Sequence, residues 1–434
     1  MHCNLNRLIK KSSIFIGGNI YGAGNIGDDA ILQGIVTLLL QSLPQCSVCV
    51  GTSQGRQLNF LPDDTEYFPV DLGNLRHVPE AVMKSDLFIS GGGTLIGDEL
   101  STRFPLEYNA RLLSTAKYYG KRTCMLAIGA NELTRASSVK PTKAILASCD
   151  LMTFRDRQSW EVCNKLGMPA KTGHITADPA FLLKAHETPR TREIKQRIHS
   201  LGRCFGINVV NECWHSQIEY KKAIAVAVRE VAKRHKMTPV LFATEVRQGQ
   251  AFDNYANQQT AALLTCDHHI MPPVYLDPCE MIDVISQFDF VLAMRMHALI
   301  FAANAGVPFA SVSRIDKVDN VLDLFGKRPA GTVTDCSPHE ITDEIESILR
   351  YRTRFLRVIR KTVREQAEIF YANGQLLRRL TEGSHTDRRY SQDMMPYVSY
   401  APSLTRTLHR LITGQVPLKK AKNALRRRLR KIRR

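Results

Sequence analysis

The sequence predicts an α/β protein with two doubly wound parallel sheets, and three observations lead to this prediction. Short apolar runs alternate with amphipathic helical stretches along most of the 434 residues, which is typical of parallel strands joined by crossover helices. A polar, charged stretch at residues 184–203 divides this alternation into two series, and we expect it to be a hinge. The chain is also long for one core, because two or three domains are typical of this length.

The first unit, predicted for residues 1–183, contains two glycine-rich turns. The turn at residues 22–29 leads into a helix, and Asp28 and Asp29 fall in the first helical turn, where carboxylates are favoured. The other turn, Gly91-Gly92-Gly93-Thr94, follows a strand directly. Strands of this unit are expected near residues 12–18, 47–51, 86–90, 126–129, 151–155 and 172–176.

The second unit, predicted for residues 204–335, repeats the alternation of strands and helices. Its strands are expected at residues 204–210, 238–243, 274–276, 288–294 and 307–312. A long charged helix at residues 336–385 follows and is expected to pack back across both units. Residues 386–402 are predicted to be a linker, and residues 403–434 a basic amphipathic tail.

The net charge of +18 is concentrated at the C-terminus. Residues 394–434 hold 12 of the 59 Lys and Arg residues and no Asp or Glu, so 47 basic residues face 41 acidic ones in the remainder. In the tail at residues 403–434, apolar residues recur on two helical faces and the other faces are basic. We favour binding of this tail to an anionic membrane surface. A solvated basic tail and a nucleic-acid arm are the alternatives, but we expect no specific nucleic-acid partner.

The eleven cysteines lack the spacing of a disulfide framework. Cys46 and Cys49 form the one close pair, and no second pair or histidine lies at zinc spacing, so we expect no metal site. No apolar run approaches the roughly 18 residues of a membrane span, and the apolar stretch Ile14–Ile16 is too short for a signal peptide. These features lead us to expect a cytoplasmic protein, held at the inner face of the membrane through its tail.

One strand-to-helix corner, Phe288–Pro308, has the chemistry expected of a ligand site. Its buried strand turns through Arg295-Met296-His297 into a helix that a glycine and a proline close. In parallel sheets, ligands bind at the carboxyl ends of the strands, where the N–H groups at a helix start favour anions. Arg295 and His297 therefore lie where an anionic ligand is expected.

Arg155 occupies the same kind of position, directly after the apolar run at residues 151–154. Taken alone, such a residue is more often a locally paired arginine at a helix start. The two glycine-rich turns are likewise common in any parallel sheet, and neither is a P-loop, because no Lys-Ser/Thr pair follows. Two such turns in one sheet nevertheless favour a polyanion or sugar site, since glycine lets a ligand approach backbone N–H groups.

Six motifs in the same order resemble those of the polysaccharide pyruvyl transferase family, over roughly residues 12–330. They are GNIYGAGNIGDDAIL (18–32), SDLFISGGGTLIGDE (85–99), FRDRQSW (154–160), ADPAFLL (177–183), GINVVN (206–211) and AMRMHALIFAANAGVPF (293–309). Ala293 stands where the family often has glycine, Met296 stands where it often has leucine, and SRIDK (313–317) follows the family pattern loosely.

The resemblance implies two Rossmann-like domains that face each other across a cleft, as in GT-B glycosyltransferases, with the active site between them. It also implies a transferase that moves the enolpyruvyl unit of phosphoenolpyruvate onto two hydroxyls of a sugar, forming a pyruvate ketal and releasing phosphate. The acceptor would be a polysaccharide or a lipid-linked oligosaccharide. Phosphoenolpyruvate is then a co-substrate, no cofactor is expected, and the sequence carries no signal for an oligomeric state.

Phosphoenolpyruvate presents a carboxylate and a phosphate, so guanidinium groups suit its recognition. We assign donor binding to Arg155, Arg295, Lys317, Gly91, Gly92 and Gly93. His297 is the candidate general acid, because histidine most readily exchanges a proton near neutral pH. Asp98 and Asp28 are the other catalytic candidates, and Asn25 and Gly27 are acceptor-side candidates. Roles as turn or helix caps are an equal alternative for the polar members of this set, and Asp178 is expected to be structural.

Two other functions fit the same sequence. A glycosyltransferase of this fold would use a nucleotide-sugar donor and release a nucleotide. A non-catalytic member of a polysaccharide-assembly complex would bind the ligand without turnover. The presence of Arg155, Arg295 and His297 argues against the loss of activity.

Overall fold

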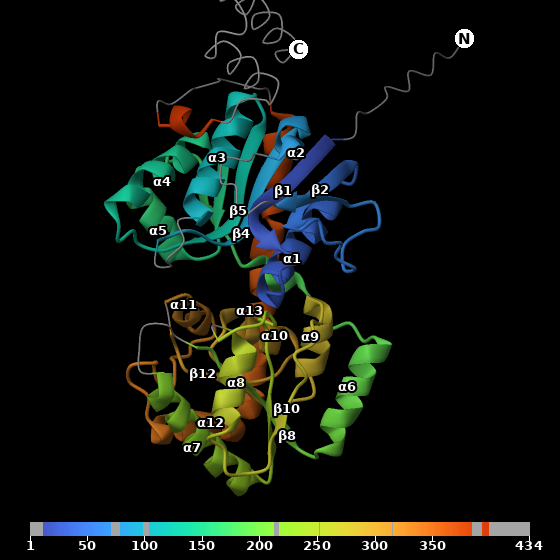
Figure 1. The fold of residues 1–434 in the computed structure, drawn as a ribbon, viewed down its shortest axis with the longest axis vertical. Coiled ribbons are helices and arrows are strands. Elements are labelled where there is room, and N and C mark those ends of the chain that lie inside the picture. The colour runs from blue at the N-terminus through green and yellow to red at the C-terminus, as the bar shows by residue number, and fades with distance from the viewer. Residues whose placement is uncertain are drawn as a thin grey trace, which may run out of the picture.

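The computed structural model describes residues 12–70, 79–98, 104–211, 217–250, 252–314, 316–383 and 393–398. Two parallel β-sheets, each flanked by helices, form the two lobes seen in Figure 1. The predicted α/β fold with doubly wound parallel sheets is therefore confirmed. Among these residues, no helix combines the length and the apolar character that a membrane span requires.

The first sheet has seven strands in the order β3-β2-β1-β4-β5-β6-β7, and every neighbouring pair is parallel. Its strands are β1 (Ser12–Tyr21), β2 (Cys46–Ser53), β3 (Glu66–Val70), β4 (Leu87–Ile96), β5 (Arg122–Ala130), β6 (Leu151–Phe154) and β7 (Gly173–Ile175). The helices are α1 (Ile26–Ser42), α2 (Glu80–Lys84), α3 (Phe104–Tyr118), α4 (Ala136–Ser148), α5 (Arg157–Lys165) and the short 3-10 helix η1 (Pro179–Leu182).

Side chains alternate across the first sheet, so its strands supply two separate cores. Phe15 and Phe88 stack with their ring centroids 5.8 Å apart, in the core that includes α3 and α4. Ile14 and Ile16 lie in the opposite core, together with the apolar side chains of α1. Both faces are therefore covered, which is why the strands are apolar on both sides.

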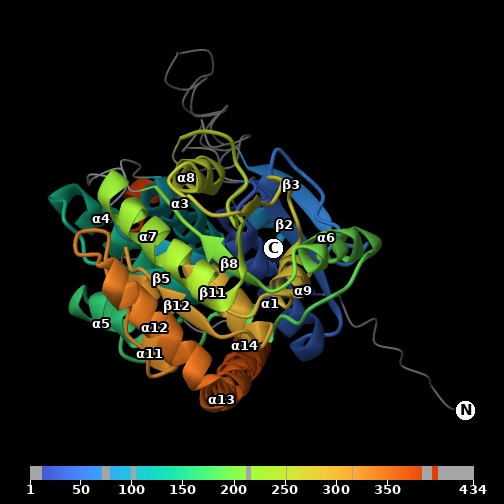
Figure 2. The ribbon, with the colours of Figure 1, turned by 90° about the horizontal axis from the view of Figure 1, so that it is seen from below.

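The second sheet has five parallel strands in the order β10-β9-β8-β11-β12. These are β8 (Cys204–Asn208), β9 (Thr238–Leu241), β10 (His269–Ile270), β11 (Val291–Ala293) and β12 (Phe309–Ser311). The helices are α6 (Pro189–Ser200), α7 (Gln217–His235), α8 (Asp253–Ala261), α9 (Pro278–Ile285), α10 (Met296–Asn304) and α11 (Asp316–Leu324). Figure 2 views this domain from below, with α6 beside α9 on one side.

One strand predicted for the second half is absent, and the stretch between the two domains contains a helix. Residues 274–276 are not a strand, and β10 pairs with β9 instead. The two prolines before them, Pro272 and Pro273, have no N–H to donate to a sheet ladder. The stretch at residues 184–203, expected as a hinge, contains α6, which begins with a capping box between Thr188 and Thr191.

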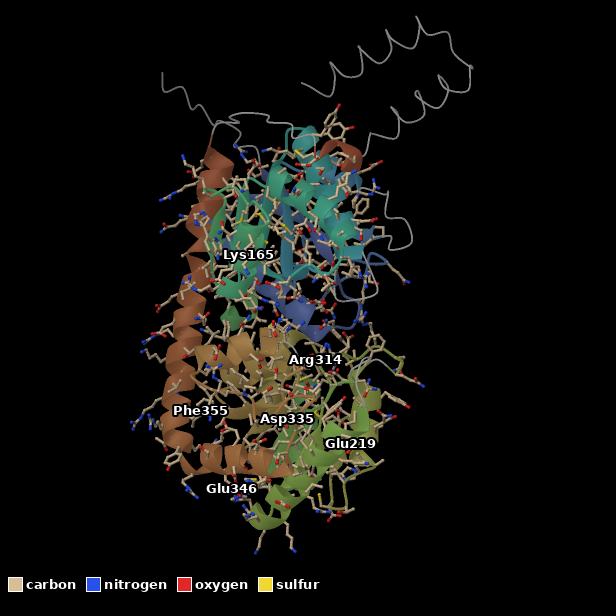
Figure 3. The ribbon with its side chains drawn as sticks, turned by 90° about the vertical axis from the view of Figure 1, so that its left-hand side faces the viewer. Lys165, Glu219, Arg314, Asp335, Glu346 and Phe355 are labelled. Atoms are coloured by element: carbon tan, nitrogen blue, oxygen red, sulfur yellow. The ribbon has the colours of Figure 1, made fainter. Side chains whose placement is uncertain are left out.

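The single helix predicted for residues 336–385 is in fact three helices. They are α12 (Pro338–Arg350), α13 (Arg352–Tyr371) and α14 (Asn373–Glu382), and the last 3-10 turn is η2 (Met395–Tyr397). Figure 3 shows α13 and α14, one after the other, running along the two lobes, with α12 nearly perpendicular to α13. Ile345 of α12 enters the core of the second domain, whereas Leu377 of α14 enters the core beside α1. The chain changes direction at Tyr351, between α12 and α13, and this turn allows both side chains to be buried.

Backbone pairing joins the two domains next to the start of α1. The N–H of Ile26 donates to the carbonyl of Thr244 over 2.9 Å, and Asn25 and Glu245 form an isolated antiparallel bridge. We call these four residues the interdomain bridge. Ile26 also packs into the core of the second domain. The bridge holds the carboxyl ends of the two sheets against each other.

Candidate functional site

The strand order places a crevice at the same point in both sheets. In the first sheet β1 and β4 are neighbours, but the helices that follow them belong to opposite cores. In the second sheet the equivalent neighbours are β8 and β11. Ligands of open α/β sheets bind at such switch points, outside the carboxyl ends of the strands.

The two crevices meet in one cavity of about 60 Å³. Its lining comes from both domains: Asn25, Asp28, Gly93, Thr94, Arg155, Thr244, Met294, Arg295, Met296, His297, Arg314, Lys317 and Val318. A second cavity, of about 580 Å³, adjoins it and shares Arg155, Met296 and Lys317 with it. The cleft between the domains is therefore wider than the inner cavity alone.

Four basic side chains line the inner cavity. Arg155 comes from the first domain, and Arg295, Arg314 and Lys317 come from the second. Asp28 is the single carboxylate among the described lining residues. Burial, followed by the charges of Arg155, Arg314 and Arg295, lowers the pKa of Lys317 to about 7. Such a concentration of positive charge is suited to a ligand with more than one negative charge.

Arg295 is the N-cap residue of α10 and is held by a buried carboxylate. Its Nε and NH2 groups donate to Asp253 Oδ1 over 2.9 and 2.7 Å. Burial alone would lower the pKa of Arg295, but Asp253 raises it above its ordinary value. The paired guanidinium group keeps further N–H donors for a ligand, because this pairing uses two of its five.

Arg155 follows β6 and lies against the first sheet. Its NH2 group donates to Thr94 Oγ1 over 3.1 Å, and its NH1 group lies 3.5 Å from Asp178 Oδ2. A Cβ at Gly129 would lie 2.7 Å from the NH2 group of Arg155, so no larger residue fits there unless the arginine moves. These contacts direct Arg155 along the carboxyl ends of the strands.

His297 lies in the first turn of α10, between the two domains. Its Nε2 atom is 3.7 Å from Asp178 Oδ2, and its ring packs directly over Gly27, where a Cβ would overlap Nδ1. Burial alone would raise the pKa of Asp178, but His297 and Arg155 lower it, so the group is a carboxylate at neutral pH. His297 Nε2, Asp178 Oδ2 and Arg155 Nε are buried atoms without a hydrogen-bond partner in the described part of the chain. These atoms take part only in ion pairs of 3.5 to 3.7 Å, too long for hydrogen bonds, so a ligand could still supply their hydrogen-bond partners.

The structure brings seven of the predicted site residues together. Asn25, Asp28, Gly93, Arg155, Arg295, His297 and Lys317 all line the inner cavity. Asn25 caps α1 by accepting from the N–H of Gly27, and its Nδ2 group donates to Asp28. Gly27 does not line the cavity, but the absence of a side chain there makes room for His297.

Three predicted site residues lie elsewhere, and the predictions for them are corrected. The carbonyl of Gly91 accepts from the Tyr21 hydroxyl, and a Cβ at Gly92 would overlap Ile31, so both glycines serve packing within the domain. Asp98 accepts from the N–H groups of Thr134 and Arg135, just before α4. Burial alone would raise the pKa of Asp98, but these hydrogen bonds lower it to about 2, which does not suit a proton donor at neutral pH.

The sequence interpretation assigned no functional role to four residues of the site: Thr94, Asp178, Asp253 and Arg314. Arg314 follows β12 at a strand's carboxyl end, so the signal that identified Arg155 and Arg295 was available for it as well. Asp178 was noticed but expected to be structural. Asp253 had no local signal, because it begins a helix far from any strand end in the sequence. In the described ranges, no group of three or more metal-ligating side chains is close enough to hold a metal ion.

Comparisons with known proteins agree with this architecture. A model of the polysaccharide pyruvyl transferase family matches residues 25–316, which include every lining residue of the inner cavity except Lys317 and Val318. No curated protein sequence matches the chain.

Solved structures with the same fold share little sequence with this chain. A protein from Listeria monocytogenes assigned as a UDP-N-acetylglucosamine 2-epimerase has a TM-score of 0.57 and 13% identity, covering 87% of this chain and 98% of its own. MnaA of S. aureus, solved with UDP, has a TM-score of 0.54 and 10% identity, covering 86% and 94%. Alr3699/HepE of Anabaena, solved with UDP-glucose, has a TM-score of 0.53 and 14% identity, covering 86% and 99%. At these identities the likeness concerns the fold alone, and it supports the GT-B-like arrangement of two Rossmann-like domains.

Proposed function

Because the chain belongs to the polysaccharide pyruvyl transferase family, we propose that it transfers the pyruvyl group of phosphoenolpyruvate to two hydroxyls of a sugar. The family makes the protein a transferase with a role in pyruvyl transfer. Phosphoenolpyruvate as the donor, a pyruvate ketal as the product and phosphate as the leaving group are our proposal.

The observation that carries the proposal is the convergence of three arginines, one lysine and one histidine on a single cavity. Phosphoenolpyruvate has two anionic groups, a carboxylate and a phosphate, at a short and fixed separation. Guanidinium groups bind such groups through two parallel hydrogen bonds, and Arg155 and Arg295 approach the cavity from opposite domains. Arg314 and Lys317 supply the additional charge that a trianionic ligand requires.

The proposed reaction has two addition steps. One sugar oxygen bonds to the central carbon of the donor while His297 gives a proton to the methylene carbon, and the proton of that hydroxyl restores the histidine. The bond to phosphate then breaks, and the second hydroxyl bonds to the same carbon, its proton leaving with the phosphate. Asp178 remains a carboxylate and stabilises the protonated imidazole beside it.

The acceptor is proposed to be a sugar of a polysaccharide or of a lipid-linked oligosaccharide. Asn25 and Asp28, on the wall contributed by the first domain, are suited to orient its hydroxyls. The adjoining cavity of about 580 Å³ supports this proposal, because it provides room beside the donor for a second substrate. The basic tail at residues 403–434 lies outside the described residues, so its binding to an anionic membrane stays a prediction from the sequence.

The test is to incubate the protein with phosphoenolpyruvate and candidate glycosides or lipid-linked sugars. We expect release of inorganic phosphate together with an acceptor whose mass increases by one pyruvate ketal. Release of a nucleotide from a nucleotide sugar, with no consumption of phosphoenolpyruvate, would instead identify a glycosyltransferase. Binding of phosphoenolpyruvate without turnover of any acceptor would favour a non-catalytic role.

A further inference from the structure

We propose that Asp253 is a positioning residue that couples the donor-binding Arg295 to the interdomain bridge. In this proposal the donor site is complete only when the two domains are closed on each other. The identity of the donor rests on the proposed function, but the coupling itself does not.

The first link is between Asp253 and the side chain of Arg295. Asp253 is the first residue of α8 and is fully buried, with an exposed fraction of 0%. Its Oδ1 atom accepts from both Nε and NH2 of Arg295. These two bonds to one oxygen hold the Nε–NH2 edge of the guanidinium group against Asp253, which limits the direction of its remaining N–H donors.

The second link is between Asp253 and the bridge. Its other oxygen, Oδ2, accepts from the backbone N–H groups of Thr244 and Glu245 over 3.0 and 3.1 Å. The carbonyl of Thr244 accepts in turn from the N–H of Ile26 in the first domain, and the next pair, from the N–H of Val246 to the carbonyl of Gly24, continues the contact over 2.9 Å. The carboxylate of Asp253 therefore holds both Arg295 and the backbone at residues 244–246, which pairs with the first domain.

Neighbouring side chains do not substitute for Asp253. Glu245, another carboxylate whose charge acts on Arg295, is occupied by Arg247 at 2.6 and 2.7 Å. Asn208 contributes an amide that donates to Asp253 and accepts from the backbone N–H of Arg295, which fixes the backbone but not the guanidinium group. The orientation of Arg295 thus depends on the carboxylate of Asp253.

The coupling follows from these shared contacts. If the domains separate, Thr244 loses its partner Ile26, and the segment that binds Asp253 Oδ2 loses its anchor in the first domain. Conversely, an anion that binds between Arg155 and Arg295 draws the two domains together. Donor binding and domain closure should therefore stabilise each other.

The first experiment compares Asp253→Asn with Asp283→Asn. Asp283 is a matched control, because it is also a buried carboxylate of the second domain and binds Lys195 and Thr191 away from the cavity. The asparagine side chain keeps one acceptor oxygen and replaces the other with an N–H₂ group, which cannot accept a hydrogen bond. Either the bonds from Arg295 or the bonds from Thr244 and Glu245 are therefore lost in Asp253→Asn. We expect phosphoenolpyruvate to bind at least about tenfold more weakly in Asp253→Asn, measured by calorimetry, with a larger change in KM than in kcat. Asp283→Asn should bind it as the wild type does.

The second experiment tests the bridge without changing Asp253. Ile26→Pro removes the N–H that donates to Thr244 and the isoleucine side chain, and its ring carbon Cδ lies where that hydrogen was, against the Thr244 carbonyl, so this bridge contact cannot form. Proline is well tolerated by the helix itself at this position, the first residue of α1. Ile26→Ala removes the side chain but keeps the N–H, so it controls for lost packing. We expect Ile26→Pro to weaken phosphoenolpyruvate binding more than Ile26→Ala does.

Small-angle X-ray scattering separates this inference from the proposed function. Without any ligand, Asp253→Asn and Ile26→Pro should have a larger radius of gyration than their matched controls. Equal radii and equal phosphoenolpyruvate affinities in variants that remain folded would overturn the coupling. A wild type that does not bind phosphoenolpyruvate would contradict the proposed donor, and the scattering comparison would then decide the coupling alone.

Discussion

The protonation of Lys317 should make donor binding depend on pH. Burial and three neighbouring guanidinium groups lower the pKa of this lysine to about 7, so half of the molecules carry an uncharged lysine near neutral pH. A bound phosphoenolpyruvate would add negative charge beside it and favour the protonated form. Below pH 7 the lysine is already protonated and contributes fully to binding. Its contribution declines from pH 7 upward and is lost as the pH rises through the higher pKa that the lysine has in the complex.

The size of the pH effect on affinity follows from the difference in the pKa of Lys317 between the free protein and the complex. An opposite charge within a few ångströms favours the charged form of a group by a factor of about 100. With that factor, about one tenth of the free protein carries the proton at pH 8, whereas nearly all of the complex does. The affinity for phosphoenolpyruvate should therefore be about tenfold lower at pH 8 than at pH 6, and binding at pH 8 should take up about 0.8 proton.

Isothermal titration calorimetry in buffers with different ionisation enthalpies measures this proton uptake directly. Lys317→Arg is the control, because arginine stays charged over this range and any remaining pH dependence then belongs to the donor. The variant should lose the drop in affinity between pH 6 and pH 8 that Lys317 causes, and should keep only the pH dependence that comes from the donor's own phosphate. If the wild type and Lys317→Arg take up the same number of protons at pH 8, Lys317 is not the titrating group and the reasoning fails.

Three further predictions concern catalysis and the tail. His297→Asn should abolish turnover while phosphoenolpyruvate binds within a few fold of its wild-type affinity, and near-normal phosphate release would reject His297 as the proton donor. Gly27→Ala should lower kcat by about 100-fold or more, because its methyl group overlaps His297 Nδ1. Gly55→Ala is the control: Gly55 lies in a turn with a φ of 71°, so an alanine there costs stability, but its nearest neighbour is 3.8 Å from the added Cβ and belongs to Pro69, so kcat should be unchanged. Equal kcat values in these two glycine variants would show that the position of His297 is not critical. Deleting residues 403–434 should release the protein from anionic vesicles in a sedimentation assay, and undiminished binding would assign the membrane contact to another part of the chain.

Much of the fold could be predicted from local patterns. Apolar runs of strand length, separated by helical stretches, specify parallel sheets whether or not the strand order is known. The same logic located Arg155, Arg295 and His297, because a polar residue directly after a buried strand must lie at the carboxyl edge of the sheet. Lys317, eight residues after the motif that ends at Phe309, was found through the resemblance to a family pattern.

The glycines show where local patterns are ambiguous. Gly91, Gly92 and Gly93 form one run in the sequence, yet only Gly93 lines the cavity, while Gly92 makes room for Ile31 and Gly91 lies close to Tyr21. A close approach by a ligand and a close approach by a neighbouring side chain both require glycine, so the sequence does not distinguish them. Asp98 shows the same ambiguity, since a carboxylate at a cleft edge and a carboxylate that holds a turn look alike before the chain is folded.

The sequence by itself determined the fold class, the two strand-to-helix corners and the basic character of the site, because each of these depends on residues that are neighbours along the chain. Only the tertiary structure decided which residues act together. Asp178 lies beside His297, and Asp253 beside Arg295, across separations of 119 and 42 residues. Such pairings depend on how two sheets and two domains meet, and no local pattern records that.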